Sequence, residues 1–275
     1  MKIQLPFAFA LLPFLLFSGL FSCNKKNDVS THVLSSDNNG IFGKVLVYDE
    51  YGNLLPDAAT GVKITVKGID TSVSNSVTFD TSFTLTADDK SFFSIKKCPT
   101  KESYSLSFTK DGFGMYKVSG ISHSSASGDT IATTVLAKTP LATVHIDSIR
   151  LTKDSRLLYI NRTVTLTAPV SSTYAVVTRY FFSNSEFVSD KLYSYQWVSG
   201  ATQGIGGYIS SVKVQKATDL FASSGIDTTK EIYVRAYIDN VKFYGYKDSA
   251  KATSMIFPNI TSPSNVVSFI MNYTK

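Results

Sequence analysis

Apolar and polar residues alternate with a period of two along several stretches of this 275-residue chain. Val62, Ile64 and Val66 are each followed by a polar residue, and similar alternation recurs at residues 83–86 and 104–108. Because successive side chains of a strand point to opposite faces, this pattern predicts antiparallel strands with one buried and one wet face. Turn-forming clusters separate the strands at close spacing, which is typical of β-sandwiches. We therefore predict an all-β fold of two consecutive antiparallel β-sandwich domains.

The composition supports a folded β protein. Hydrophobic residues make up 43% of the chain and charged residues 17%, which argues against disorder. Fifteen Tyr and nineteen Phe accompany only four Met and one Trp, a balance that favours strands over helices. The formal charge of +6 is spread along the chain, and the longest like-charge runs are Lys pairs. A nucleic-acid binder usually concentrates its cations, so we expect no nucleic-acid partner.

The N-terminus has the layout of a secretory signal. A positive start at Lys2 precedes an almost purely apolar run at residues 5–21, which contains Pro6 and Pro13. A retained transmembrane helix is the alternative, but it needs about 20 apolar residues and seldom carries two prolines. We therefore expect residues 1–22 to be removed as a signal peptide, which leaves 275 − 22 = 253 residues and a charge of about +5.

Leu20, Ser22 and Cys23 resemble the lipobox of bacterial lipoproteins. The resemblance implies that the Cys23 thiol carries a diacylglyceryl group and that the chain is anchored in the outer membrane by lipid. Two or three acyl chains make a stable anchor, since each buried CH₂ contributes about 0.8 kcal/mol. An ordinary signal peptide with a chance cysteine is the alternative. Residues 23–40 are polar and read as a flexible, lipidated tether.

Residues 41–138 resemble the carboxypeptidase regulatory-like domain, a transthyretin-like β-sandwich. The resemblance implies a structural module without a defined activity, which would act as a spacer. It rests on glycines that turn the chain, on apolar and aromatic residues that fill a core and on Pro99. These residues are Gly43, Val45, Asp49, Gly52, Pro56, Ala58, Val62, Thr86, Asp88, Phe93, Ile95, Pro99, Tyr104, Leu106, Phe108, Gly112 and Phe113.

Residues 138–140 (Lys-Thr-Pro) look like a domain boundary, and residues 141–275 form the second predicted sandwich. Residues 231–237 with Tyr244 and Gly245 resemble a strand pair of fibronectin-type-III-like repeats in surface proteins of Bacteroidetes. The resemblance implies an immunoglobulin-like fold. The expected strands are 143–151, 157–167, 174–182, 191–198, 207–214, 231–238, 241–247, 252–257 and 265–271, with a short helix at 216–226.

The sequence offers little chemistry. None of His32, His123 and His145 begins a metal-binding motif, and we place His123 in a Ser-rich surface loop and His145 on a strand surface. Nucleotide-binding loops and nucleophile elbows are missing, so we expect neither a metal nor a cofactor. Cys98 is expected to be a half-buried, unreactive residue.

Two rows of aromatic residues in the second region are the candidate ligand surface. Alternation places the first row on one face of a strand and the second, with an arginine, on another. Exposed aromatic rows suit sugar rings and protein partners. The alternative is that one row fills the core and the other covers a rim. The candidate residues are Tyr193, Tyr195, Trp197, Tyr233, Arg235 and Tyr237.

Four short motifs match the O-glycosylation pattern of exported Bacteroidetes proteins. Each consists of Asp, then Thr or Ser, then a third residue, with the hydroxyl as the acceptor. The acceptors are Thr130, Ser148, Thr228 and Ser249.

Taken together, these features predict a non-enzymatic outer-membrane lipoprotein that binds or presents a glycan or protein ligand through its second sandwich. One alternative is a structural subunit of a surface fibre or secretion complex. Another is a glycan-active enzyme, for which Glu186, Asp190 and Asp239 would supply carboxylates. Whether the protein faces the surface or the periplasm is left open.

Overall fold

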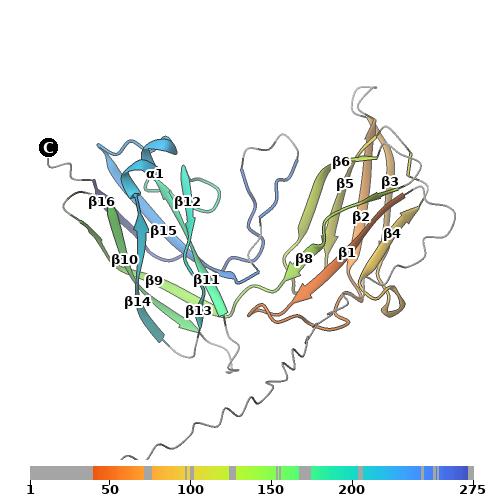
Figure 1. Cartoon of the computed structure of the whole chain (residues 1–275), viewed down its shortest axis with the longest axis horizontal. Helices are drawn as coiled ribbons and strands as arrows, with labels where there is room; N and C mark the ends of the chain where they lie inside the picture. Colours follow the sequence, from red (N-terminus) through yellow and green to blue (C-terminus); the bar gives the residue numbers. More distant parts are fainter. Residues whose placement is uncertain are drawn as a thin grey trace, which may run out of the picture. The chain divides into compact units, whose positions relative to one another are not determined.

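The computed structural model describes most of the chain from residue 40 onward. The described residues are 40–70, 76–96, 98–99, 102–123, 128–152, 154, 156–166, 175–203, 207–242, 245–249, 252 and 254–271. Within them the protein is built from strands, with one short α-helix and one 3₁₀ helix (Figure 1). The all-β prediction is confirmed. In the same residues no helix is both long and apolar enough to span a membrane. The predicted signal peptide, Cys23, His32 and almost all of the tether lie outside the described residues.

The strands before residue 138 form two sheets around one core. One sheet has the order β4-β1-β7, with β8 also paired to β1, and the other has the order β3-β2-β5-β6. The other named strand pairs of this region are antiparallel, as predicted, whereas β7 and β8 run parallel to β1. The chain passes from β6 in the opposite sheet to β7 beside β1, and such a crossover does not impose the antiparallel direction of a hairpin. The elements are β1 (Gly40–Tyr48), β2 (Lys63–Asp70), β3 (Ser76–Thr84), η1 (Ala87–Asp89), β4 (Phe92–Lys96), β5 (Glu102–Thr109), β6 (Tyr116–His123), β7 (Asp129–Thr130) and β8 (Thr134–Ala137).

The period-two alternation builds this first core. Val62, Ile64 and Val66 are fully buried, while Lys63 and Lys67 are exposed. On the neighbouring strand, the apolar members of the run at 104–108 are also fully buried. Burying an aliphatic or aromatic side chain of this size contributes about 1.5–3 kcal/mol, so these residues dominate the stability of the first sandwich.

The strands after residue 141 form a three-stranded and a five-stranded sheet. The first has the order β14-β10-β9 and the second β12-β11-β15-β16, with β13 also paired to β11. The elements are β9 (Ala142–Leu151), β10 (Leu157–Leu166), β11 (Ala175–Ser183), β12 (Tyr195–Val198), β13 (Thr202–Gln203), β14 (Gly207–Gln215), α1 (Ala217–Ser223), β15 (Glu231–Asn240) and β16 (Val266–Ile270).

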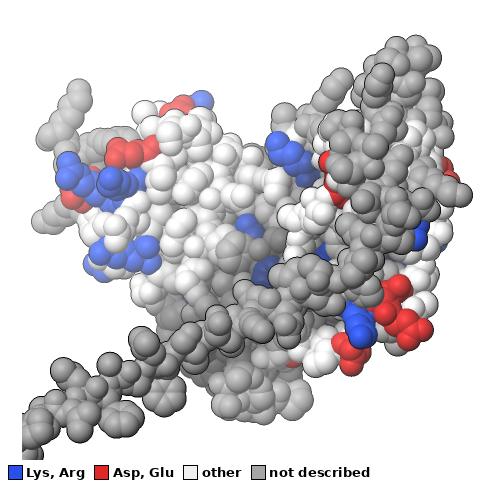
Figure 2. All heavy atoms as spheres, turned by 45° about the vertical axis from the view of Figure 1, so that its right-hand side comes forward, with Lys and Arg blue, Asp and Glu red and all other residues white. Residues whose placement is uncertain are grey.

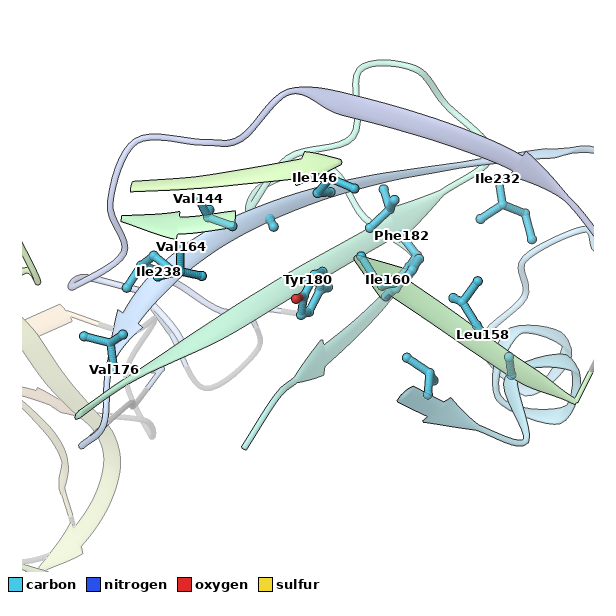
Figure 3. Close-up of a cluster of buried hydrophobic side chains, with 14 of the residues drawn as sticks. Val144, Ile146, Leu158, Ile160, Val164, Val176, Tyr180, Phe182, Ile232 and Ile238 are labelled. Atoms are coloured by element: carbon cyan, nitrogen blue, oxygen red, sulfur yellow. The ribbon is translucent and has the colours of Figure 1, made fainter. Parts of the chain in front are cut away.

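The second core lies between these two sheets and contains a polar contact. Aliphatic side chains from both sheets surround Tyr180 and Phe182 (Figure 3). Arg162 is 2% exposed and donates a hydrogen bond of 2.6 Å from Nη1 to the Tyr180 hydroxyl. Burial raises the pKa of Tyr180 to about 12, although the charge of Arg162 opposes the rise. The Tyr180 phenol is therefore neutral over the physiological range.

Two predicted strands, 241–247 and 252–257, are not strands in the described residues. One isolated antiparallel bridge joins Tyr246 to Ile256 through backbone hydrogen bonds of 3.0 and 2.8 Å. No further strand partner extends this pair among the described residues, so the alternating sequence has no sheet to join. The expected strand at 191–198 is shortened to Tyr195–Val198.

Among the residues that Figure 2 colours as described, the charged side chains lie in small separate groups between uncharged ones. This distribution follows from the sequence, in which Lys and Arg are spread over the solvated positions of many strands.

Candidate functional site: the outer face of the β11–β15 sheet

β11 is buried on both of its faces, which is unusual for an antiparallel sandwich strand. Its even-numbered residues, such as Tyr180 and Phe182, face the core, whereas Arg179 and Phe181 face away from it. Phe181 packs with Val188, Tyr237 and Phe257 in a separate cluster on the outer face of the sheet. Further side chains pack partly buried against this cluster: Tyr193, Tyr233, Met255, Ile260 and Val266. The outer face therefore carries its own small apolar layer.

The structure divides the predicted aromatic residues between the two faces. Tyr195 and Trp197 are half-buried and pack against the main core, where the Trp197 ring lies 5.5 Å from that of Tyr180. Tyr193 precedes β12 and packs on the outer face, with its ring 4.9 Å from that of Phe181. The prediction that the residues at 193, 195 and 197 share one face is thus wrong, because β12 begins only at Tyr195.

The second predicted row does lie together on the outer face. Alternation along β15 places Tyr233, Arg235 and Tyr237 on the side opposite the buried Val234 and Ala236. Tyr237 is only 4% exposed, whereas Tyr233 and Arg235 are half-buried. Tyr193, Tyr233 and Arg235 are therefore the predicted residues that reach the surface of the outer face.

A buried ion pair crosses the two central strands beneath this surface. Arg179 donates to Asp239 Oδ2 from Nε at 3.1 Å and from Nη2 at 2.8 Å, and Nη1 donates to Gln196 at 2.8 Å. The guanidinium also lies 4.2 Å from the centre of the Phe257 ring. Burial raises the pKa of the Asp239 carboxyl, and Arg179 opposes this rise. Because Asp239 is 1% exposed and already paired, it is unsuited to act as a catalytic acid.

Carboxylates and phenols alternate around the exposed part of the outer face. The Tyr233 hydroxyl donates to Glu231 Oε2 at 2.9 Å, which raises the pKa of Tyr233, and the charge of Glu186 raises it further. A hydrogen bond from Ser268 holds the pKa of Glu231 below its usual value. The Tyr237 hydroxyl lies 3.4 Å from Asp190 Oδ1, and burial raises the pKa of Tyr237. At neutral pH the face therefore presents neutral hydroxyls beside charged carboxylates.

Sequence reasoning missed two exposed apolar residues beside this face. The β11–β12 connection carries Phe187, which is 71% exposed, and Leu192, which is 51% exposed. Val188 between them is fully buried in the outer cluster and anchors the connection to the sheet. Backbone hydrogen bonds join Val188 to Ser185 and Ser189 to Leu192, which fixes two turns. These residues follow no helical or strand period, so the only available signal was the presence of apolar residues within a turn-rich segment.

The Arg235 side chain contributes a polar group to the same face. Its Nε is buried and has no hydrogen-bond acceptor among the described residues. The Arg235 side chain as a whole is half-buried, and its hydrogen bond with the Tyr237 hydroxyl opposes the rise that burial causes in the pKa of Tyr237. The face thus offers ring surfaces, carboxylate acceptors and a cationic donor.

The other predicted residues lie away from this face. Thr130, Ser148 and Ser249 are exposed and Thr228 is half-buried. His145 is exposed on β9. The described residues contain no group of three or more His, Cys, Asp or Glu arranged for a metal ion.

Two local expectations in the first sandwich are wrong. His123 ends β6 and is fully buried, with Nδ1 2.6 Å from Asp129 Oδ2, because β6 extends further than the Ser-rich composition indicates. Cys98 is 1% exposed rather than half-buried, and its thiol lies 3.4 Å from the Ile95 carbonyl oxygen. Both side chains fill space in the first sandwich instead of facing solvent.

Comparison with known proteins gives no family assignment. No protein-family model matches the chain, and no curated protein matches it. Among solved structures, a DUF3823 family protein from Bacteroides uniformis ATCC 8492 is similar with 11% identity and a TM-score of 0.28, over 86% of this chain and 100% of that chain. A DUF3823 family protein from Parabacteroides merdae ATCC 43184 has 14% identity and a TM-score of 0.29, over 84% and 97%. A "putative carbohydrate binding protein" from Bacteroides uniformis ATCC 8492 has 15% identity and a TM-score of 0.29, over 85% and 99%. Similarities at this level carry no argument about the function of this chain.

Proposed function

We propose that the protein is a lipid-anchored outer-membrane lipoprotein that binds a glycan through the outer face of the β11–β15 sheet. The observation that carries the proposal is the exposure of Phe187, whose neighbour in the chain, Val188, packs in the same outer cluster as half-buried Tyr193 and Tyr233. Sugar rings offer apolar C–H faces to such rings and hydroxyls to the polar groups around them. Glu186, Asp190 and Arg235 are polar groups of the required kind near these rings, and they lie on the same side of the sheet.

A partner protein is the second candidate ligand. Leu192, like Phe187, leaves half or more of its side chain in water, and Arg and Tyr are enriched at the centres of protein interfaces. An exposed leucine adds nothing to sugar recognition, so it is the specific observation that favours a protein.

The two remaining alternatives receive less support. A fibre subunit requires an open strand edge, but the side chain of Asn265 bonds both the N–H and the carbonyl of Ile146 at 2.9 Å and so occupies the β9 edge. A glycosidase requires two free carboxylates across a cleft. Asp239 is buried in an ion pair with Arg179 and is therefore not a free carboxylate. This leaves Glu186 and Asp190 of the three carboxylates that were considered for a glycosidase.

The anchor is a separate part of the proposal and has its own test. Mass spectrometry of the mature protein should find an N-terminal Cys23 with a diacylglyceryl modification, and Cys23→Ser should release the protein from membranes. An unmodified N-terminus or an intact leader would refute lipidation. Cleavage of the intact protein by protease added to whole cells would place it on the cell surface, whereas protection would place it on the periplasmic side.

The binding proposal is tested with the mature, soluble form on a glycan array, followed by calorimetry with the best glycan. Phe187→Ala combined with Tyr193→Ala should weaken binding about 30-fold or more, since one aromatic anchor contributes about 2 kcal/mol. Leu54→Ala with Leu141→Ala is the matched control, because these leucines are 51% and 50% exposed on other parts of the chain. Equal affinity in the two double variants would refute the proposed site. Capture of a partner protein that depends on Leu192, with no glycan binding, would favour the second candidate.

A further inference from the structure

The three-stranded sheet β14-β10-β9 presents a second outer face on the opposite side of the second sandwich. Along β10 the residues at 158, 160, 162 and 164 are buried, so those at 157, 159, 161, 163 and 165 face outward. The pairing registers bring outward residues of all three strands into rows across the sheet. This face is separate from the β11–β15 surface, because the core lies between the two sheets.

One of these rows places an aromatic ring between two cations. Tyr159 pairs with Arg150 on β9 and with Lys213 on β14. Arg150 and Lys213 are exposed, and the Arg150 guanidinium lies 4.6 Å from the centre of the Tyr159 ring. Among the described residues, neither cation forms an ion pair with a carboxylate.

The next two rows carry hydroxyls, an amide and an imidazole, together with the exposed apolar side chain of Ile209. Asn161 lies between Ser148 and Ser211 and donates a hydrogen bond of 2.8 Å to the Ser148 hydroxyl. Thr163 lies between His145 and Ile209 and donates to Asp147 at 3.0 Å. Rows two residues apart along a strand are separated by about 7 Å, so the three rows span a strip about 14 Å long. A strip of this kind offers repeated hydroxyl and amide contacts along a straight line.

We propose that this face binds an anionic polysaccharide, with a carboxylate or sulfate of the chain held by Arg150 and Lys213. The guanidinium fork matches the planar oxygens of a carboxylate or the oxygens of a sulfate, and Lys213 adds a point charge. One sugar ring stacks on the open part of Tyr159, and the following rings reach the hydroxyls and amides of the next rows.

The charge and shape of the face select this ligand over other polyanions. Arg156 and Lys216 are exposed at the end of the sheet nearest the Tyr159 row, and the Ala217 N–H donates to the Arg156 carbonyl at 3.1 Å. Two carboxylates lie on or beside the face and each accepts a hydrogen bond from a hydroxyl, Asp147 from Thr163 and Asp154 from Thr152 at 2.5 Å. They oppose the cations in part, so we expect the anionic group to bind at the Tyr159 row, between Arg150 and Lys213. A phospholipid headgroup would bind the cations, but it would make no contact with the row of Asn161, Ser148 and Ser211.

The test uses the soluble mature protein with polygalacturonate and dextran sulfate as anionic probes and dextran as the neutral probe. We expect binding to at least one anionic probe, weakened tenfold or more when salt rises from about 0.05 M to about 0.5 M, because exposed charges are screened. Arg150→Ala with Lys213→Ala should weaken binding tenfold or more, and Tyr159→Ala should weaken it by a similar factor. Lys67→Ala with Lys96→Ala removes the same charge from the first sandwich and should leave the affinity within twofold. If the Arg150→Ala and Lys213→Ala double variant fails to fold, Lys213→Glu at one exposed position should likewise weaken binding to the anionic probe.

Several results would overturn the inference. One is unchanged affinity in the Arg150 and Lys213 variant, and another is an equal loss in the Lys67 and Lys96 control, which would indicate binding through net charge. Equal binding of dextran would exclude an anionic requirement. Binding to phosphatidylglycerol vesicles without binding to either anionic polysaccharide would assign the face to a membrane surface. The Phe187 and Tyr193 variant should retain polyanion binding, so this inference and the proposed glycan site fail or succeed separately.

Discussion

Replacing Arg179 by Met should destabilise the second sandwich strongly, because it leaves the buried carboxylate of Asp239 without its cationic partner. Arg179 and Asp239 side chains are 4% and 1% exposed, and Arg179 donates three hydrogen bonds, two to Asp239 and one to Gln196. Removing one partner of a buried pair costs about 3–5 kcal/mol. Asp239 keeps one bond, from the N–H of Asn240 at 2.8 Å, so the lower part of that range is expected. The corresponding fall in Tm is about 10 °C for a chain of this size.

The assay is urea unfolding followed by tryptophan fluorescence. Trp197 is the only tryptophan in the chain and packs against Tyr180 in the second core, so its signal reports on this sandwich. The loss in the free energy of unfolding that Arg179→Met causes should become smaller as pH falls. Burial without Arg179 raises the pKa of Asp239 above its unfolded value, so the protonated folded form is favoured and stability is lost as pH rises through that pKa.

Two companion variants make this result specific. Arg179→Met combined with Asp239→Leu removes both charges and should recover most of the lost stability, since a pair replaced by apolar residues is often neutral. Arg150→Met removes an exposed arginine from the same sandwich and should change the free energy of unfolding by less than about 0.5 kcal/mol. A loss below about 1 kcal/mol for Arg179→Met would refute the buried pair.

Three further predictions concern other parts of the fold. The Tyr180 phenol should titrate near pH 12 in ultraviolet difference spectra, and stability should fall by about 2 kcal/mol between pH 10 and 12, because the unfolded phenol loses its proton first; a normal tyrosine titration throughout would contradict this. Cys98 should react with thiol reagents only at the rate of unfolding, because it is 1% exposed, whereas immediate labelling of the folded protein would show an accessible thiol. Asn265→Ala should cost about 1–3 kcal/mol by leaving the backbone of Ile146 without its two side-chain partners, and hydrogen exchange at Ile146 that matches the wild type would argue against that contact.

The sequence predicted the strands whose alternation reflects one buried face. Val62, Ile64 and Val66 are examples, because each strand face has a single environment and the pattern records it directly. The segments 241–247 and 252–257 failed for the opposite reason. A local pattern does not reveal whether a neighbouring strand exists, and here only one bridge joins Tyr246 to Ile256 among the described residues.

The candidate site was predicted only in part, because its burial depends on distant segments. Phe257 and Val188 cover the outer face of β11 and bury Tyr237, although alternation alone places that residue at the surface. Tyr193 was wrongly grouped on one face with Tyr195 and Trp197, because the start of β12 could not be located from sequence to within two residues. Phe187 was missed because a turn-rich connection has no period from which exposure can be inferred.

The most direct test of the central claim is hydrogen–deuterium exchange of the mature protein with and without the glycan that binds best on the array. If the glycan binds the outer face of the β11–β15 sheet, we expect slower exchange on binding in residues 184–194 and 231–237, which form and flank that face. Unchanged exchange in both segments, with protection confined to the first sandwich, would contradict it.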